Sequence, residues 1–241
     1  MQHKGAKWGF IQNRNNKNGE APIARNVRQN AYKNTEDTFG VERFQAAPLY
    51  LLNDLSMPER YGEDGSWVRI LSETDTAELV LAKIIHLNEK WMIPTKYIKP
   101  IPDSIAFFKK VIFVDKRNQN TVTLEKEDAI WKVRSMNHVT TGQCRPPYQY
   151  ETPAGIFVVQ EKKAKMYFLE DGTNDIAGFS PHASRFSNGA YIHGIPVNYP
   201  RETTIDLGTV PRSHKCVRNV TSHAEFIYGW AQNNQTLVVV F

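Results

Sequence analysis

A thiol lies between a histidine and an arginine near the C-terminal end of the chain. Residues 213–218 read SHKCVR, so Cys216 directly follows a lysine. A cysteine attacks a carbonyl carbon as its thiolate, and cationic neighbours lower the pKa of a thiol. His193 ends the apolar segment 190–192, where a side chain can be held rigidly and still reach solvent. Cysteine and histidine are the smallest set for covalent acyl transfer, and a structural or metal-binding cysteine is the alternative.

The rest of the thiol and imidazole inventory points away from a metal centre. The chain has 2 cysteines, too few for a disulfide framework or for a zinc site of thiolates alone. Cys144 follows a predicted strand, and we expect it to be a free thiol. Histidines could join Cys216 as ligands, but their spacing is not compact: His182, His193, His214 and His223. We therefore expect no metal and no cofactor.

The composition is that of a globular protein with a weak positive charge. The 241 residues are 41% hydrophobic, enough to bury a core of one large or two small domains. No apolar run approaches the roughly 18 residues of a membrane-spanning helix. The 30 Lys and Arg outnumber the 25 Asp and Glu, giving a net charge of +5. This excess fits an anionic neighbour, but without long basic tracts we expect no nucleic-acid partner.

The first part of the chain predicts a lead-in followed by a small barrel. Residues 1–43 are rich in Asn and Lys and poor in aliphatic side chains, which predicts an extended or loosely packed segment. Residues 44–102 alternate short apolar segments with turns, which predicts the strands of a small β-barrel. The segments SWVRI (66–70) and KWMIPTKYIKPI (90–101) resemble a bacterial SH3-like domain, implying a wall- or peptide-binding accessory or a spacer. We expect Trp67, Trp91 and Trp131 in the core.

The proline-rich segment at 100–102 marks the expected domain boundary, because its backbone is stiff and extended. Strands are predicted beyond it at KVIFVD (110–115), GIFVVQ (155–160) and QTLVVVF (235–241), where β-branched and aromatic residues gather. Residues 222–233 place apolar side chains on one stripe, as in a helix. The chain as a whole is therefore predicted to be mainly β, with one or two short helices.

Four segments in this order carry a second resemblance: Val114-Asp115, TPAGIF (152–157), IHG (192–194) and SHKCVR (213–218). Residues 104–241 are similar to the L,D-transpeptidase catalytic domain of the YkuD type. The resemblance implies a β-sandwich-like fold and acyl transfer on peptidoglycan. Cys216 would take the acyl group from a tetrapeptide stem as a thioester. An acceptor amine would then receive it, giving a cross-link.

The resemblance also implies roles for the residues around the thiol. His193 would be the base, and the Gly194 carbonyl would orient its ring. The backbone N–H groups of His214, Lys215 and Cys216 would form an oxyanion hole.

Three side chains are candidate substrate contacts. The guanidinium of Arg218 suits a bidentate contact with a carboxylate of the diamino acid. Ser213 is a candidate both for this contact and for holding the loop by hydrogen bonds. Tyr191 would line the substrate groove.

Two features depart from the family pattern. Lys215 stands where the family usually has glycine, and a positive φ there would strain a lysine by roughly 1–2 kcal/mol. The lysine could instead add positive charge that favours the thiolate. His193 and Cys216 are also widely spaced, so residues 195–212 form either a partly rigid flap over the site or a surface insertion.

The expected partners are peptidoglycan stem peptides and anionic wall polymers, and the resemblance implies inhibition by carbapenems. We expect a cell-envelope location, although residues 1–10 have no stretch typical of a signal peptide; a cytoplasmic protein or a removed leader both fit. Four alternatives remain open: an L,D-carboxypeptidase, a transferase that joins protein amines to stems, a catalytically impaired wall-binding protein, and a cytoplasmic cysteine hydrolase.

Overall fold

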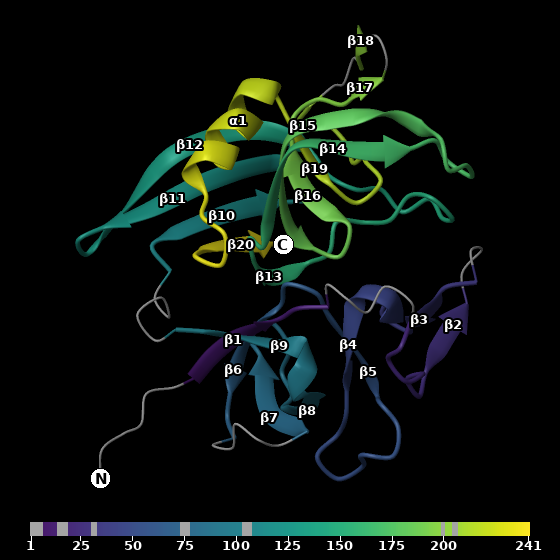
Figure 1. Ribbon diagram of the computed structural model, residues 1–241. Coiled ribbons are helices and arrows are strands. Elements are labelled where there is room, and N and C mark those ends of the chain that lie inside the picture. The colour runs from purple at the N-terminus through teal and green to yellow at the C-terminus, as the bar shows by residue number, and fades with distance from the viewer. Residues whose placement is uncertain are drawn as a thin grey trace. The chain divides into compact units, whose positions relative to one another are not determined.

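The chain forms two compact units, Met1–Phe107 and Phe108–Phe241, each with its own sheets (Figure 1). The computed structural model describes residues 7–13, 19–29, 33–72, 78–102, 108–198, 201–203 and 207–241. Strands dominate both units, which confirms the predicted mainly-β class. The expected boundary at 100–102 lies just before the division, and residues 104–107 lie outside the described part.

The first unit is built around a five-stranded sheet in the order β8-β7-β6-β1-β9. Its core is a cluster that includes Ile11, Leu49, Val68 and Ile84, all fully buried. Two hairpins, β2–β3 and β4–β5, complete the unit. The strands of the unit are β1 (Lys7–Ile11), β2 (Val27–Gln29), β3 (Thr35–Asp37), β4 (Ala46–Leu49), β5 (Arg60–Glu63), β6 (Trp67–Ile70), β7 (Leu79–Ile84), β8 (Trp91–Pro94) and β9 (Ile98–Ile101), with short 3-10 turns η1 (Arg43–Gln45) and η2 (Thr95–Tyr97).

The loosely packed lead-in predicted for residues 1–43 is wrong for β1. This strand pairs with β6 on one side and β9 on the other, and Phe10 and Ile11 are fully buried. The strands that pair with β1 come from far along the chain, so the three apolar side chains of β1 gave no local sign of this pairing. The sheet of this unit therefore needs residues from before position 44, and the SH3-like assignment stays a prediction.

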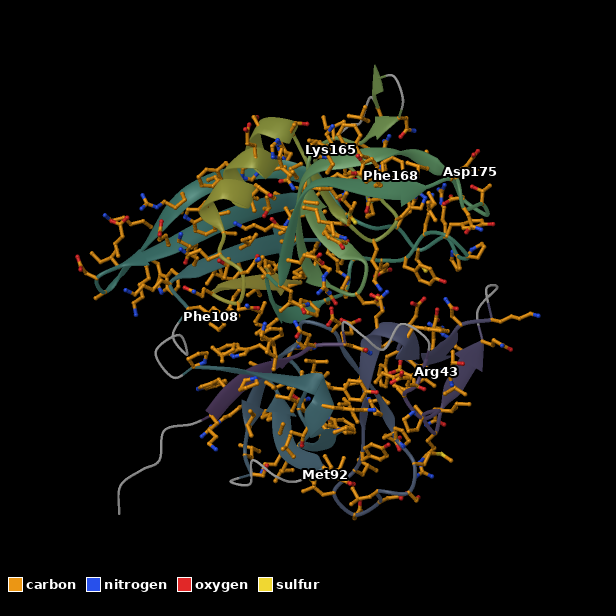
Figure 2. All side chains as sticks on the ribbon, in the orientation of Figure 1. Arg43, Met92, Phe108, Lys165, Phe168 and Asp175 are labelled. Atoms are coloured by element: carbon orange, nitrogen blue, oxygen red, sulfur yellow. The ribbon has the colours of Figure 1, made fainter. Side chains whose placement is uncertain are left out.

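The second unit holds one large sheet. Its order is β13-β20-β10-β11-β12-β19-β16-β15-β17-β18, and β14 pairs with β15 beside this path. Lys165 and Phe168 lie on β14 and Asp175 in the turn to β15 (Figure 2). The strands are β10 (Lys110–Asp115), β11 (Asn120–Glu127), β12 (Ile130–Thr140), β13 (Gly155–Val158), β14 (Glu161–Leu169), β15 (Ile176–Ser187), β16 (Ala190–His193), β17 (Val197–Asn198), β18 (Arg201–Glu202), β19 (Val217–Asn219) and β20 (Thr236–Val240).

Alternation of side chains builds the core of the second unit. Ile112 and Val114 of β10 and Val238 of β20 face one cluster and are fully buried. The helix α1 (Thr221–Trp230) contributes Ile227 to this cluster. The helix predicted over 222–233 is therefore confirmed as far as Trp230, where it ends. Within the described residues no helix has the length and apolar character needed to cross a membrane.

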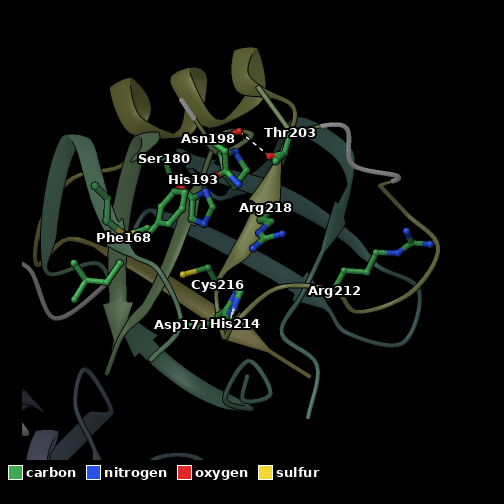
Figure 3. A pocket seen from close by; sticks show the side chains of 13 residues that line it. Phe168, Asp171, Ser180, His193, Asn198, Thr203, Arg212, His214, Cys216 and Arg218 are labelled. Atoms are coloured by element: carbon green, nitrogen blue, oxygen red, sulfur yellow. Dashed lines mark hydrogen bonds and ion pairs between the residues drawn. The ribbon is translucent and has the colours of Figure 1, made fainter. Parts of the chain in front are cut away.

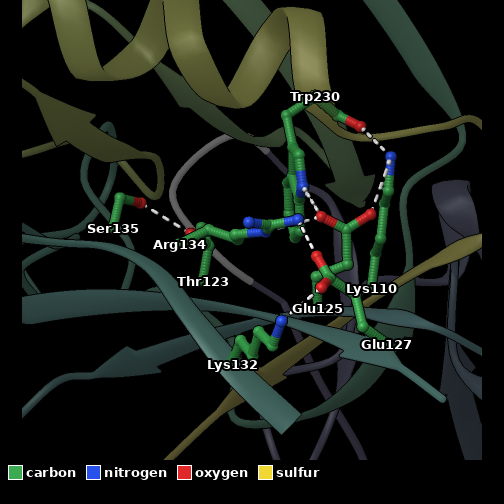
Figure 4. Close-up of polar contacts among 8 residues, drawn as sticks. All are labelled: Lys110, Thr123, Glu125, Glu127, Lys132, Arg134, Ser135 and Trp230. Atoms are coloured by element: carbon green, nitrogen blue, oxygen red, sulfur yellow. Dashed lines mark hydrogen bonds and ion pairs between the residues drawn. The ribbon is translucent and has the colours of Figure 1, made fainter. Parts of the chain in front are cut away.

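A polar network ties the end of α1 to the sheet (Figure 4). Glu125 of β11 accepts hydrogen bonds from Trp230 Nε1 at 3.0 Å and from Arg134 Nε at 2.8 Å. The Trp230 bond is the main cause that lowers the pKa of Glu125. Lys110 donates to the Trp230 carbonyl at 2.9 Å. Exposed ion pairs contribute little each, so the indole bond and the Lys110 bond to the Trp230 carbonyl are the parts of this network that hold the helix end.

The tryptophan predictions differ in outcome. Trp91 is 3% exposed and lies in the core as predicted, but Trp131 is 43% exposed. Among the described strands, β12 meets β19 only at Val139 and Thr140. Its other residues therefore have no second neighbouring strand to cover them, and the core prediction for Trp131 is wrong.

Ile227→Ala should lower the free energy of unfolding of the second unit by about 2–5 kcal/mol, because it leaves a cavity in a close-packed core. Ile130→Ala makes the same chemical change at a side chain that is 66% exposed, and should change it by less than about 0.5 kcal/mol. Urea unfolding of both variants measures the difference, and equal losses would contradict the core described above.

Candidate active site

The parallel pairing of β16 with β19 brings the predicted thiol and imidazole to one cavity. Ile192 is paired with Val217, and His193 with Arg218, so Cys216 arrives beside the strand that ends in His193. Cys216, His193 and Arg218 line a cavity of about 440 Å³ (Figure 3). The opposite wall is apolar and comes from β14: Met166, Phe168 and Leu169.

His193 is held in one tautomer. Its Nδ1 lies 2.6 Å from the Gly194 carbonyl oxygen, and since a carbonyl can only accept, Nδ1 carries the proton and Nε2 is the free acceptor. The ring is 2% exposed, and burial lowers the pKa of His193 to about 4 against the opposing effect of the Gly194 bond. His193 is therefore a neutral base at pH 7.

Gly194 is required at its position by space. A Cβ there would lie 2.9 Å from Pro181 Cγ and 3.1 Å from Thr221 Oγ1. Its amide donates to the Pro181 carbonyl at 2.9 Å. These contacts fix the carbonyl that orients His193, in the place where the sequence predicted it.

The surroundings of Cys216 have opposing effects on the pKa of its thiol. Burial raises its pKa, whereas a backbone hydrogen bond from Tyr191 and the charges of Arg218 and Lys215 lower it. The thiol donates to the Gly189 carbonyl at 3.5 Å. The buried thiol thus favours its protonated form. The cavity also holds a cation, Arg218, that favours the thiolate and a base, His193, that can take the proton.

The loop before Cys216 is fixed by two hydroxyl groups. Ser213 Oγ donates to the Cys216 carbonyl at 2.5 Å, and Thr152 Oγ1 donates to the Lys215 carbonyl at 2.8 Å. Thr152 Oγ1 also accepts from the Gly142 amide at 2.8 Å. Lys215 has a φ of +147°, a backbone conformation that favours glycine. The positive φ that would strain a lysine there is therefore present.

Two predicted site residues, Lys215 and Tyr191, lie differently from expectation, and Ser213 takes one of its two expected roles. The Lys215 amide donates to Ser213 Oγ at 3.3 Å, which removes it from the expected oxyanion hole, while the amides of His214 and Cys216 donate to no described residue. Ser213 is 1% exposed and holds the loop rather than lining the cavity. The Tyr191 ring is also absent from the described lining; it lies under the Lys163 ammonium, 5.7 Å from it. Residue types alone do not show which partner the Lys215 amide bonds or where the Tyr191 ring lies.

Sequence reasoning assigned no role to two residues near the cavity. Thr152, in the TPAGIF segment that carries the resemblance, supports the loop of Cys216 from a fully buried position. Asp171, from the turn between β14 and β15, lies 3.2 Å from His214 Nε2 at the rim. The TPAG segment was the available signal for Thr152, and no sequence signal marked Asp171.

The segment 195–212, expected to be either a flap or a surface insertion, contributes to the cavity. Pro196, Asn198 and Thr203 line it, and Thr203 Oγ1 donates to the Pro196 carbonyl at 2.7 Å. The close approach of β17 to β15 depends on Gly178, because a Cβ there would lie 2.1 Å from the Val197 carbonyl oxygen. Residues 199–200 and 204–206 of the segment lie outside the described part.

The second thiol and the metal question are separate from this cavity. Cys144 is a free, exposed cysteine and is not among the residues that line it. In the part of the chain that the structure describes, no group of three or more His, Cys, Asp or Glu side chains could hold a metal ion.

The fold and the site together define a class of protein: a mainly-β unit with a buried imidazole and a thiol at one cavity. A family model of the L,D-transpeptidase catalytic domain (YkuD) matches residues 109–240, more than half of the chain. The chain therefore belongs to this family. No curated protein matches the sequence.

Several solved structures are similar in fold to this chain, at 15–20% sequence identity. An L,D-transpeptidase from Mycobacterium smegmatis is 16% identical, over 72% of this chain and 82% of that one, with a TM-score of 0.44. L,D-transpeptidase 3 from Mycobacterium tuberculosis is 15% identical, over 73% and 91%, with a TM-score of 0.45. A fused Zn-dependent amidase, peptidase and peptidoglycan-binding protein from Clostridium acetobutylicum is 20% identical, with a TM-score of 0.42; the match covers 55% of this chain and only 52% of that one.

Thr152→Val should lower the free energy of unfolding of the second unit by about 1–3 kcal/mol, because the Gly142 amide and the Lys215 carbonyl lose a buried partner while the volume is kept. Thr152→Ser retains the hydroxyl and should keep most of that stability. Chemical unfolding of the pair measures the difference. Equal stability of Thr152→Val and the parent would show that the hydroxyl does not support the loop.

The free energy of unfolding of the second unit should decrease as the pH is lowered, because His193 is buried in its neutral form. Its pKa is about 4 when folded against 6.5 for the unfolded side chain, so the unfolded state binds the proton first. The contribution is fully present above about pH 6.5 and is lost as the pH falls towards 4, to a total of about 3 kcal/mol. His193→Gln should make the slope of unfolding free energy against pH shallower in this window, and an unchanged slope would contradict a neutral buried ring.

Proposed function

We propose that this protein is a peptidoglycan L,D-transpeptidase that works through a cysteine thioester. Family membership sets the reaction class. The observation that carries the chemistry is that Cys216 lies in one cavity with His193, whose neutral Nε2 is free to accept a proton. A buried thiol with a raised pKa needs such a base, and a neutral imidazole supplies it at pH 7.

The first half-reaction forms the thioester. His193 Nε2 takes the proton of Cys216, and the sulfur attacks the carbonyl on the L-centre of the diamino acid at the third stem position. The tetrahedral intermediate collapses as the carbon–nitrogen bond to the terminal D-alanine breaks. The imidazolium returns its proton to that amine, which leaves as free D-alanine.

The second half-reaction transfers the acyl group. An acceptor amine from a neighbouring stem attacks the thioester carbon, His193 takes the proton of the amine, and the Cys216 thiolate leaves. The proton then returns to the sulfur. Water in place of the amine would give a trimmed tripeptide, the product of an L,D-carboxypeptidase.

Charge developing on the carbonyl oxygen needs donors. The amides of His214 and Cys216 are the candidates, and donors of this kind are typically worth about 3–4 kcal/mol in the transition state. Arg218 is a candidate anchor for a substrate carboxylate. Its Nε is buried without a hydrogen-bond partner among the described residues, and burial lowers its pKa. An anionic group of the substrate would offset that burial.

The proposed setting is the cell envelope. Stem peptides are the proposed substrates, and the net charge of +5 suits anionic wall polymers. One solved L,D-transpeptidase structure is a complex with imipenem, a carbapenem. By analogy, a carbapenem should acylate Cys216 here.

Incubation with a carbapenem, followed by an intact-mass spectrum, tests this proposal. The wild-type protein should gain the mass of one inhibitor, and Cys216→Ala should gain none. Cys144→Ala is the matched control and should be labelled like wild type, because Cys144 is exposed and outside the cavity. His193→Gln should slow labelling by about 10²–10⁴-fold through loss of the base.

Reaction with purified tetrapeptide stems then separates the possible products by mass. Cross-linked dimers that depend on Cys216 support the transpeptidase, and tripeptides without dimers identify a carboxypeptidase instead. Stem processing that survives Cys216→Ala would overturn the proposal.

A further inference from the structure

A chain of hydrogen bonds begins in the sheet and ends on the backbone of β19. The hydroxyls of Thr123 on β11 and Ser135 on β12 lie 2.6 Å apart (Figure 4). Ser135 Oγ also lies 2.8 Å from Nε2 of His223, in the first turn of α1. His223 Nδ1 lies 2.9 Å from Asn219 Oδ1, and Asn219 Nδ2 donates to the Val217 carbonyl at 3.3 Å. The reaction described above uses none of these side chains.

The chemistry of the groups gives this chain one direction. Because Asn219 Nδ2 donates to a carbonyl, its Oδ1 faces His223 as an acceptor, so His223 Nδ1 carries the proton. Burial lowers the pKa of His223 to about 4, so the ring is neutral at pH 7 and Nε2 accepts from the Ser135 hydroxyl. Thr123 Oγ1 then donates to Ser135. Every group has a fixed role as donor or acceptor, and the last donor acts on the carbonyl of Val217.

The end of the chain lies beside the active site. The Val217 carbonyl belongs to the peptide unit that continues into Arg218, and Cys216 directly precedes Val217. Cys216 and Arg218 both line the cavity. Yet β19 has only 3 residues, and its described pairing is two positions with β12 and two with β16. Further contacts to this short strand therefore help to decide where the thiol and the guanidinium stand.

The first turn of α1 also holds the other half of the site. Thr221 Oγ1 accepts from the Ile195 amide at 3.2 Å. That amide shares a peptide unit with the Gly194 carbonyl, which orients His193. His223 stands two residues further along the same turn. One turn of helix thus contacts the backbone on the base side through Thr221 and on the nucleophile side through His223.

Stability alone does not account for a polar chain at this place. Thr123 and Asn219 are fully buried, and His223 is 5% exposed. Apolar side chains of the same shape can replace both partners of a buried hydrogen bond at little or no loss of stability. What a hydrogen bond adds is direction, because it weakens steeply when donor and acceptor are misaligned. A chain of directed bonds therefore holds the peptide unit between Val217 and Arg218 at one angle.

We propose that His223 is a positioning residue of the active site. Its hydrogen bond to Asn219 fixes the backbone of β19, and with it the places of Cys216 and Arg218 in the cavity. This assignment rests on the proposed role of Cys216 as nucleophile. His223 is not among the described residues that line the cavity, so it acts through Asn219. The reactivity of the thiol should therefore follow the Asn219 bond and not the overall stability of the unit.

Two substitutions at position 223 separate positioning from stability, because each keeps one of the two ring contacts. His223→Asn places an amide where Nδ1 stands and keeps the bond to Asn219. His223→Gln places an amide where Nε2 stands and keeps the bond to Ser135. Iodoacetamide labelling of Cys216, followed by intact mass from pH 5 to pH 10, measures the reactivity of the thiol without any substrate. The full chain with Cys144→Ser serves as parent, because the exposed Cys144 would react as well.

Both variants should unfold at a lower urea concentration than the parent, because each breaks one buried hydrogen bond. His223→Gln should slow labelling about 3- to 10-fold, the equivalent of one neutral hydrogen bond, whereas His223→Asn should keep the rate of the parent. Ser135→Ala breaks the same bond as His223→Asn without a change in α1, and it should behave alike. Asn219→Leu removes the acceptor at similar volume and should slow labelling as His223→Gln does.

Equal labelling rates of His223→Gln and His223→Asn would overturn the proposal. So would rates that simply follow the free energies of unfolding of the four variants, because that is the outcome of a purely structural role. A selective loss of labelling in His223→Gln, in a protein that processes no stem peptide, would refute the proposed function and leave this inference standing.

Discussion

The parallel pairing of β16 with β19 is the interaction on which the cavity depends. It fixes the register of His193 against Arg218 and so delivers the residue before β19, Cys216, to the same place. Neither strand could hold this position alone. β15 and β12 continue the sheet on the two sides, and α1 covers the core beneath. Because parallel strands need a crossover, the segment between them is free to supply the rest of the site.

Residue types predicted the strands of the second unit well and the first unit less well. The predicted segments contain the strands 110–115, 155–158 and 236–240, because their runs of β-branched and aromatic residues are a local signal. β1 escaped prediction because its partners β6 and β9 lie far along the chain. The prediction for Trp131 was wrong for a different reason. Its local pattern is that of a buried strand, but at Trp131 the strand β12 pairs with β11 on one side and with no described strand on the other. Burial is decided by neighbours that a local pattern does not contain.

The same distinction explains which site residues could be predicted. Cys216 and His193 were recognisable by residue type, the family resemblance implied the role of Gly194, and the structure places the three together. Of the two roles expected for Ser213, the structure shows the hydrogen bond that holds the loop, whereas Tyr191, expected to line the groove, contributes a backbone bond to the sulfur instead. Hydrogen bonds between side chain and backbone depend on loop conformation, which composition does not encode.

Burial at this cavity has two opposite consequences, and together they explain its construction. It makes His193 a neutral base, which suits proton transfer at pH 7, but it also opposes the thiolate that the base would generate. An imidazolium partner for the sulfur is therefore disfavoured before the reaction begins, whereas the charge of Arg218 favours the thiolate. Arg218 lines the cavity from β19, and Lys215 directly precedes the thiol at a φ of +147°. Thr152 and Gly142 then become necessary, because a residue kept at an unfavourable φ needs a framework that holds it there.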